Sequence, residues 1–232
     1  MRLIVFSDIH GNSYALDSFF EKIKEIDYDV LIFCGDIFGY YYNQKQIIEK
    51  LAARKDLVWL KGNHDQYFLD IYNGKVEREY YIQNYGHSYE GLRERYGERD
   101  VALIDSHPSE YVLMVGDCKV GIFHGTPENS LEGRLYPDKP ILNHEKYEDY
   151  DIVILGHTHC RMLRTEGETL VVNSGSLGQP RDGSGYGFAM IDTELRTASF
   201  HNVEIDEKRL YSQIDMYDPD LSKLKEVLER RI

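Results

Sequence analysis

Aspartate, asparagine or histidine follows an apolar run at five places in this chain. The first is residues 2–12, RLIVFSDIHGN, whose apolar part is typical of a buried strand. If the extended backbone continued past that strand, Asp8 and His10 would project from one face, because side chains alternate along a strand. A carboxylate oxygen and an imidazole nitrogen directed at one point suit a divalent metal ion. This pair indicates a candidate metal site at the carboxyl end of a strand, where open α/β sheets place their ligands.

Four further apolar runs end in a similar polar motif. These motifs are GD at 35–36, GNHD at 62–65, HG at 124–125 and GHTH at 156–159. Glycine at such a position lets the backbone turn sharply and approach an ion or a phosphate closely. Five of the nine histidines of the chain lie in these motifs, although histidine is not a typical residue for ending a strand.

Together the motifs offer seven oxygen or nitrogen ligands and no thiolate: Asp8, His10, Asp36, Asn63, His124, His157 and His159. One closed tetrahedral zinc site needs only four protein ligands. Seven ligands suit two ions with one carboxylate bridging them. Two ions about 3.5–4 Å apart are able to hold the attacking and leaving oxygens of an in-line displacement at phosphorus.

Each motif alone also has a structural interpretation. Asp36 or Asn63 would more often be a turn or capping residue. His124 would more often be a core histidine, and the pair His157 and His159 an exposed part of a strand. The joint occurrence of the motifs at strand ends is what favours a metal centre over these readings.

Length and charge restrict the class of protein. The 232 residues suffice for one large domain or two small ones, and 42% hydrophobic with 29% charged residues is ordinary for a globular protein. The formal net charge of −13 argues against tight binding to long nucleic acid or to an anionic membrane. It does not exclude a small nucleotide held by metal ions, because the ions supply positive charge locally.

The cysteines and the amino terminus indicate a reducing compartment. Cys34, Cys118 and Cys160 show no close Cys-x-x-Cys spacing, so we expect buried reduced thiols. The chain starts directly with its first strand, without a charged and apolar leader. No apolar run approaches the roughly 20 residues that a spanning helix needs. We therefore expect a cytoplasmic protein.

Apolar periodicity predicts the elements that position the motifs. Strands at 29–34 and 57–60 alternate with helices that begin at Asn12 or Ser13 and at about 44, which indicates parallel βαβ units. A tyrosine-rich segment at about 66–105 is interpreted as a helical cap. Further strands are expected at 110–115, 119–123, 151–155, 161–164, 169–172, 187–191 and 198–203. A closing helix is expected to start at Asp218, with Pro219 at its first position.

The ordered motifs resemble the calcineurin-like metallophosphoesterase superfamily. They span residues 8–159, and residues 173–181, NSGSLGQPR, are similar to the branch of small single-domain prokaryotic phosphodiesterases. That branch often has proline where this chain has Ser174. The expected fold class is α/β (α+β mixed), a four-layer α-β-β-α sandwich of two mixed sheets with a helical insertion. We expect one domain over 1–232, with the cap insertion at about 66–105.

The resemblance also implies a role for each polar residue of the motifs. The first metal is held by Asp8, His10 and His159, the second by Asn63, His124 and His157, and Asp36 bridges both. A hydroxide shared by the metals attacks phosphorus in line. His64 is the candidate that stabilises the phosphoryl oxygens and protonates the leaving alkoxide. Asp65 could orient His64 or its loop.

Two further residues are candidates for binding the substrate. Asn12 opens the first helix, whose amino terminus could add backbone donors for phosphate. Arg181 could contact the substrate phosphate or pair with the acidic surface. The tyrosines at 40–42 could stack on a nucleobase or pack under a loop.

The function expected from the resemblance is hydrolysis of small phosphate esters, foremost phosphodiesters. The alternatives are a dinucleoside polyphosphate hydrolase, a protein or nucleotide phosphomonoesterase, and a non-enzymatic scaffold such as the retromer subunit that resembles these enzymes. The presence of His64 and of every ligand disfavours the scaffold. Two divalent ions are implied; we expect Mn²⁺ first, and Fe, Ni²⁺, Co²⁺ or Zn²⁺ as alternatives. The expected partner is a small phosphate ester or nucleotide.

Overall fold

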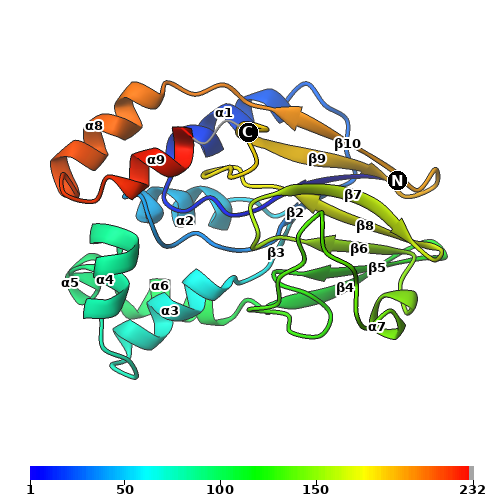
Figure 1. The fold of residues 1–232 in the computed structure, drawn as a ribbon, viewed down its shortest axis with the longest axis horizontal. Coiled ribbons are helices and arrows are strands. Elements are labelled where there is room, and N and C mark those ends of the chain that lie inside the picture. Colours follow the sequence, from blue (N-terminus) through cyan, green and yellow to red (C-terminus); the bar gives the residue numbers. More distant parts are fainter. Residues whose placement is uncertain (230–232) are drawn as a thin grey trace.

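The computed structural model describes residues 1–229 of the chain. Within this part, two five-stranded sheets lie one against the other (Figure 1). The first sheet contains, in spatial order, β10 (Thr197–Asn202), β9 (Gly187–Asp192), β1 (Arg2–Phe6), β2 (Val30–Phe33) and β3 (Leu57–Trp59). Strands β1, β2 and β3 are parallel, as the strand–helix alternation predicts, and β9 and β10 add two antiparallel pairings.

The second sheet is also mixed. It contains, in spatial order, β4 (Glu110–Val115), β5 (Cys118–Phe123), β6 (Ile152–Leu155), β8 (Thr169–Ser174) and β7 (Arg161–Glu166). The three central strands are parallel, and both edge strands pair antiparallel with their neighbours. The motifs at 124–125 and 156–159 directly follow β5 and β6. The histidines of both motifs therefore lie at the carboxyl ends of these two parallel strands.

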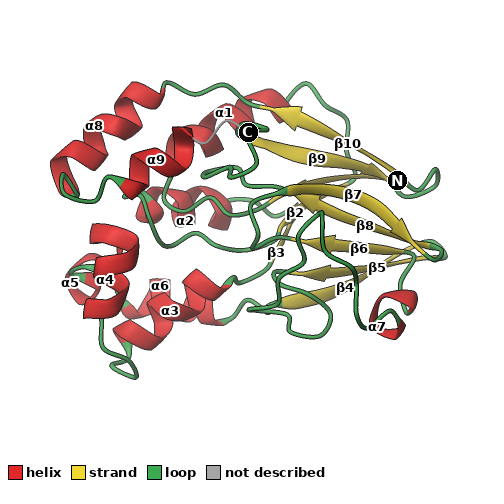
Figure 2. Ribbon diagram, in the orientation of Figure 1, coloured by secondary structure: helices red, strands yellow, loops and turns green. Residues whose placement is uncertain are grey.

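Helices lie outside the sheets and at one end of them (Figure 2). The first half contributes α1 (Ser13–Ile23), α2 (Gln44–Ala52), α3 (Asn63–Tyr72), α4 (Glu79–Tyr85), the short 3-10 helix η1 (Gly86–Tyr89), α5 (Leu92–Arg95) and α6 (Glu98–Asp105). The second half contributes α7 (Glu145–Glu148), α8 (Glu207–Tyr217) and α9 (Lys223–Glu229). The tyrosine-rich segment is therefore helical, as expected, and lies beside α3 at the lower left of Figure 1.

The strands carry apolar residues on both faces because both faces are covered. On β1, Ile4 and Phe6 lie in a core with Phe19 of α1, whereas Leu3 and Val5 lie in the core between the two sheets. The outer face of the second sheet is covered by the loop after β5 and by α7. These layers confirm the predicted α-β-β-α sandwich, whose fourth layer consists largely of loop.

The closing helix was predicted wrongly in one respect. An unexpected helix, α8, precedes it, and Asp218 follows the last residue of α8 instead of starting α9. The carboxylate of Asp218 accepts hydrogen bonds from the Tyr42 hydroxyl, at 2.8 Å, and from the His87 amide, at 3.0 Å. Because the carboxylate of Asp218 makes these tertiary contacts, it does not cap the amino terminus of α9.

The three cysteines form no disulfide with one another. All three cysteines are free thiols; Cys34 is buried, and Cys118 and Cys160 are half-buried. In residues 1–229 no helix combines the length and the hydropathy required to cross a lipid bilayer.

Candidate metal centre

Loops from the two sheets meet at the ends of β1, β2, β5 and β6. The amide of Asp8 donates to the carbonyl of Gly35 at 2.9 Å, and the amide of Gly156 donates to the carbonyl of His124 at 3.0 Å. The amide of His157 donates to Asp8 Oδ2 at 3.1 Å, which joins the loop after β1 to the loop after β6. Residues separated by up to 150 positions are thereby fixed around one point.

The backbone at this point is strained. Five of the seven non-glycine residues with positive φ in the described chain are predicted ligands: Asp8, His10, Asp36, His157 and His159, with φ between 48° and 71°. A left-handed conformation costs a residue with a Cβ roughly 1–2 kcal/mol and persists only where the surroundings impose it. The extended backbone considered for Asp8 and His10 is therefore not observed, because the strand ends at Phe6. Tight turns bring the two side chains together instead.

Two glycines have the close-approach roles that the motifs suggest. Gly35 adopts φ 98°, which is accessible to glycine alone at little cost. A Cβ on Gly62 would overlap the carboxylate of Asp36. Both glycines thus allow the loops after β2 and β3 to lie against each other.

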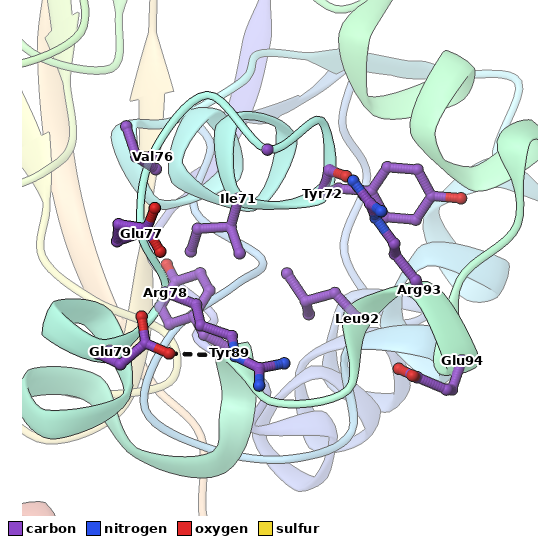
Figure 3. Close-up of a pocket in the computed structure, with 11 residues that line it drawn as sticks. Ile71, Tyr72, Val76, Glu77, Arg78, Glu79, Tyr89, Leu92, Arg93 and Glu94 are labelled. Carbon is purple, nitrogen blue, oxygen red and sulfur yellow. Dashed lines mark hydrogen bonds and ion pairs between the residues drawn. The ribbon is translucent and has the colours of Figure 1, made fainter.

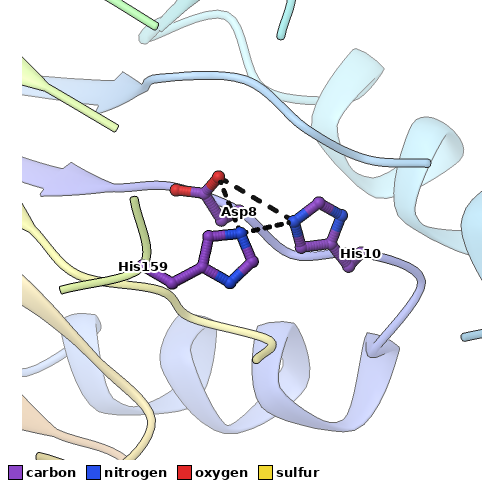
Figure 4. A group of neighbouring side chains, drawn as sticks. All are labelled: Asp8, His10 and His159. Carbon is purple, nitrogen blue, oxygen red and sulfur yellow. Dashed lines mark hydrogen bonds and ion pairs between the residues drawn. The ribbon is translucent and has the colours of Figure 1, made fainter. Parts of the chain in front are cut away.

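The first ligand group contains Asp8, His10 and His159 (Figure 4). The two histidine Nε2 atoms lie 2.9 Å apart, and Asp8 Oδ1 lies 3.4 Å from that of His159 and 3.8 Å from that of His10. All three side chains are almost fully buried. Three potential ligand atoms therefore surround one point that a cation could occupy.

The second ligand group lies beside the first and shares Asp36 with it. Asn63 Oδ1 lies 2.9 Å from both His124 Nε2 and His157 Nδ1. Asp36 Oδ2 lies 3.4 Å from His124 Nε2 and 3.7 Å from His10 Nε2. The carboxylate of Asp36 is thus within reach of both groups, as a bridging ligand must be.

Two carboxylate oxygens in the centre have no hydrogen-bond donor. Asp8 Oδ1 and Asp36 Oδ2 are buried and without a partner, whereas the second oxygen of each carboxylate accepts a backbone amide. An unpaired buried acceptor costs several kcal/mol, and an unpaired buried charge costs more. A cation at each group would compensate these oxygens, so the donor set suits a pair of metal ions.

Three of the histidines are held with their lone pairs directed inward. A carbonyl oxygen only accepts hydrogen bonds, so a ring nitrogen facing one carries the proton and leaves the other nitrogen free to bind a metal. Three such contacts are His10 Nδ1 to Phe38 O at 2.6 Å, His124 Nδ1 to Cys34 O at 2.7 Å and His159 Nδ1 to Gln179 O at 2.8 Å. The facing Nε2 atoms of His10 and His159 therefore both present lone pairs, an arrangement that a cation between them stabilises.

Burial sets the protonation of the centre in the absence of metal. Desolvation raises the pKa of Asp8 to about 7 and raises the pKa of Asp36 well above its usual range. Desolvation also lowers the pKa of His10 and His159 strongly and that of His157 to about 2. These three imidazoles are therefore neutral at pH 7, as metal ligands must be.

The Asp8→Asn variant should be more stable than the wild type without metal, by an amount that grows from about pH 4 to about pH 7. The native pKa of Asp8 is raised from 3.8 to about 7, so the folded wild type retains a proton that the unfolded chain releases in this window and loses stability there. The difference should level off on the order of 4 kcal/mol, because one pKa unit corresponds to about 1.4 kcal/mol.

Denaturant unfolding of both proteins with a chelator, over a pH series, measures this difference. Saturating divalent metal should reverse the order of stability, because only the wild type has the carboxylate. A difference between the two proteins that does not change with pH would contradict the burial argument.

Asp65 organises the loop that carries Asp36. Its two carboxylate oxygens accept hydrogen bonds from four backbone amides, those of Asp36, Ile37, Phe38 and Gly62, at 2.8–3.2 Å. Of the two roles that the sequence left open for Asp65, orienting His64 or orienting the loop, the structure shows the second. The side chain of Asp65 is fully buried.

The Asp65→Ala variant should lose about 3–5 kcal/mol of unfolding free energy. Four buried amides would lose a charged acceptor, and each unsatisfied buried group costs about 1–3 kcal/mol before relaxation. Thermal and denaturant unfolding without metal measure the loss. Asp138→Ala, at an exposed site, is the control and should change stability little; equal effects of the two variants would contradict this role.

His64 lies in an aromatic surrounding next to the ligand groups. One of its ring nitrogens lies within 4.8 Å of ligand atoms of His10 and Asp36. Its backbone amide donates to Asp36 Oδ1 at 2.8 Å, and its ring contacts the rings of Tyr40 and Tyr85. The structure therefore brings His64 together with all seven predicted ligands.

The two predicted substrate-binding residues differ in their surroundings. Asn12 is fully buried; its Oδ1 accepts the Ala15 amide, capping α1, and its Nδ2 donates to the Gly178 carbonyl. Arg181 donates to the Tyr40 hydroxyl, at 2.8 Å, and to Gln179 Oε1. Arg181 is positioned at the rim of the centre, whereas the side chain of Asn12 is used by the fold.

Sequence reasoning missed two residues that contact the centre. Arg134 donates from Nε to His157 Nε2 at 2.8 Å, and the Tyr89 hydroxyl lies 2.8 Å from His64 Nδ1. Arg134 belongs to a loop without periodic pattern, and Tyr89 is one of many tyrosines in its segment. No spacing signal in the sequence distinguishes either residue from its neighbours.

Comparison with known proteins identifies the family to which this fold and this centre belong. The calcineurin-like phosphoesterase superfamily domain matches residues 1–196. The chain belongs to this family, which confirms the resemblance seen in its motifs. The buried clusters of histidine and aspartate are consistent with the dinuclear metal site that the motifs predict.

Individual relatives match nearly the full chain in sequence or in fold. An uncharacterized protein of Methanocaldococcus jannaschii is 26% identical over 231 residues, covering 91% of both proteins. The structure of a metallophosphoesterase from Sphaerobacter thermophilus has a TM-score of 0.80 at 22% identity and covers 100% of this chain and 99% of that one. A hypothetical protein from Pyrococcus horikoshii has a TM-score of 0.75 at 23% identity and covers 98% and 96%.

Proposed function

We propose that this protein is a dinuclear metal-dependent hydrolase of small phosphate esters, foremost phosphodiesters. The observation that carries the proposal is the pair of buried, unpartnered oxygens, Asp8 Oδ1 and Asp36 Oδ2, facing neutral imidazoles. Two cations would compensate both oxygens at once. A pair of divalent ions, when bound, supplies a water-derived nucleophile at neutral pH and neutralises charge at phosphorus.

In this proposal the residues of the two groups divide the ions between them. One ion would be held by Asp8, His10 and His159, the other by Asn63, His124 and His157, with Asp36 shared. Asp36 is oriented for sharing because its other oxygen accepts the His64 amide. Mn²⁺ is our first candidate for both ions, since mixed oxygen and nitrogen donors suit it.

The remaining polar residues would act on the substrate. His64 would donate a proton to the leaving oxygen, which contributes about 10²–10⁴-fold in comparable reactions. Arg134 and Arg181 would supply positive charge for the phosphate oxygens. The guanidinium of Arg134 donates to His157 of the centre, and that of Arg181 donates to Tyr40 at the rim. Asn12 would contribute through the amino terminus of α1 and not through its side chain.

The helical segment at about 66–105 is proposed to be a cap within a single domain that shapes the choice of ester. Tyr67 and Tyr85 place aromatic rings 5.3 Å and 4.6 Å from the ring of His64. Such rings favour a planar organic group on the ester. A dinucleoside polyphosphate is therefore the second candidate substrate.

Metal-loaded wild type should hydrolyse bis(p-nitrophenyl) phosphate, and a panel with a dinucleoside tetraphosphate and a phosphopeptide should rank diesters first. A chelator should abolish the activity, and Mn²⁺ should restore it. The control His144→Ala removes an exposed histidine and should retain full activity. Absence of turnover with every metal tested, together with a stable protein partner, would favour the scaffold alternative.

A further inference from the structure

His64 has a hydrogen-bond partner of an unexpected kind. Its Nδ1 lies 2.8 Å from the hydroxyl of Tyr89, a residue 25 positions later at the end of η1. The same hydroxyl donates to the backbone carbonyl of His64 at 3.1 Å. Tyr89 is fully buried, so solvent does not compete for these contacts.

The two contacts of the Tyr89 hydroxyl favour one tautomer of His64. A phenol has one proton, and a carbonyl oxygen only accepts. When the proton of Tyr89 is donated to the carbonyl of His64, the contact to Nδ1 is satisfied only if Nδ1 carries a proton and donates it to the phenol oxygen, and this is the arrangement in which both contacts are hydrogen bonds. The neutral imidazole then has its lone pair on Nε2.

We propose that Tyr89 is a positioning residue that holds His64 in this tautomer, so that Nε2 alone exchanges a proton with the substrate. The inference rests on the proposed function of the site. Nδ1 carries a proton in both the neutral and the charged imidazole, so the hydrogen bond to Tyr89 persists through turnover. Water first gives a proton to Nε2, which forms the imidazolium. When the P–O bond to the leaving group breaks, this Nε2–H bond breaks, an O–H bond forms on the leaving oxygen, and the ring returns to the neutral Nδ1–H tautomer.

The carboxylate next to His64 in sequence is not the partner of its ring. Both carboxylate oxygens of Asp65 accept hydrogen bonds from backbone amides, four in all. The ring is also confined at Gly39, where a Cβ would lie 2.5 Å from Nδ1. A neutral phenol in place of a carboxylate adds no negative charge beside Asp8 and Asp36, whose ionisation burial already opposes.

Tyr89 also lies beside a cavity outside the metal centre. It lines a cavity of about 390 Å³ between the end of α3 and α5, where it lies near Ile71 and Leu92 (Figure 3). Truncation of Tyr89 would extend this cavity toward His64. A small aromatic molecule could then occupy the space that the side chain leaves.

The tautomer can be measured without any activity. In metal-free protein, the ¹⁵N chemical shifts of the His64 ring should show a protonated Nδ1 and an unprotonated Nε2. In Tyr89→Phe the two tautomers should become mixed, because the acceptor for Nδ1–H is lost. A protonated Nε2 in the neutral wild-type ring would overturn the proposal, whether or not the protein proves to be a hydrolase.

Kinetics tests whether the tautomer matters for turnover. Tyr89→Phe should lower kcat about tenfold, the effect of one hydrogen bond, with KM and metal content unchanged. In a His64→Ala background the same substitution should have no further effect. The matched control Tyr96→Phe removes the hydroxyl of another buried tyrosine of the segment and should retain wild-type kcat. Equal losses from Tyr89→Phe in both backgrounds would indicate packing alone and overturn the proposal.

Rescue separates the hydroxyl from the ring. Tyr89→Ala should regain kcat when phenol is added, whereas toluene, which fills the same space without a hydroxyl, should not restore it. Equal rescue by both compounds would overturn the proposal. If the variant fails to fold, Tyr89→Phe carries the test. An inactive wild type with the expected ¹⁵N shifts would refute the proposed function and leave the His64–Tyr89 pair standing.

Discussion

Asp36→Asn should reduce the hydrolysis of bis(p-nitrophenyl) phosphate by roughly a thousandfold or more. Asp36 Oδ2 is a carboxylate atom near both ligand groups, at 3.4 Å from His124 Nε2 and 3.7 Å from His10 Nε2. An amide in this place would not join two cations. A loss of about 4 kcal/mol of transition-state stabilisation corresponds to a thousandfold in rate.

The same substitution should leave the fold intact, which separates its effect from simple unfolding. Asparagine retains an oxygen for the His64 amide, and it removes a buried carboxyl group whose pKa burial raises. Without metal the melting temperature should therefore be unchanged or higher, while bound metal falls below two ions per chain. Asp138→Asn, at an exposed site, is the matched control. Full activity of Asp36→Asn would refute the bridging role.

His64→Ala should lower kcat by about 10²–10⁴-fold while two ions per chain remain bound. The size of the loss follows from the removal of a general acid. His64 is adjacent to Asn63 in sequence but uses Nδ1 for Tyr89 and not for the centre. Initial rates and metal analysis of the same preparation measure both quantities, with His144→Ala as the control.

The metal content of this variant decides between two roles of His64. Its ring lies close enough to His10 and Asp36 to be counted as a third ligand group. If His64→Ala lost one ion, His64 would be a ligand and its role as proton donor would be wrong. Unchanged activity with unchanged metal would contradict both roles.

The sequence predicted the fold, and it pointed to a set of candidate ligands that the structure brings together, because both are encoded locally. Each ligand stands directly after an apolar run, and parallel strands bring their carboxyl ends to one edge of a sheet. The family motifs supplied the order, and the glycines at 35 and 62 indicated where the chain turns closely. The sequence also predicted the layers, since strands that are apolar on both faces must be covered on both.

What the sequence missed depends on tertiary contacts. The contact of Tyr89 with His64 joins residues 25 positions apart, and no periodicity marks one tyrosine among many. The start of the last helix was misplaced because Asp218, a good capping residue, is used by Tyr42 and His87 instead. The left-handed backbone of Asp8 and His10 was likewise invisible, because neighbouring loops impose it.

The most direct test is the number and position of metal ions in the wild-type protein. Crystals grown with Mn²⁺ and measured at the manganese absorption edge should show two anomalous peaks per chain, about 3.5–4 Å apart. One peak should lie among Asp8, His10 and His159, the other among Asn63, His124 and His157, with Asp36 touching both. A single peak, or none in this cluster at saturating metal, would contradict the dinuclear centre on which the proposed function depends.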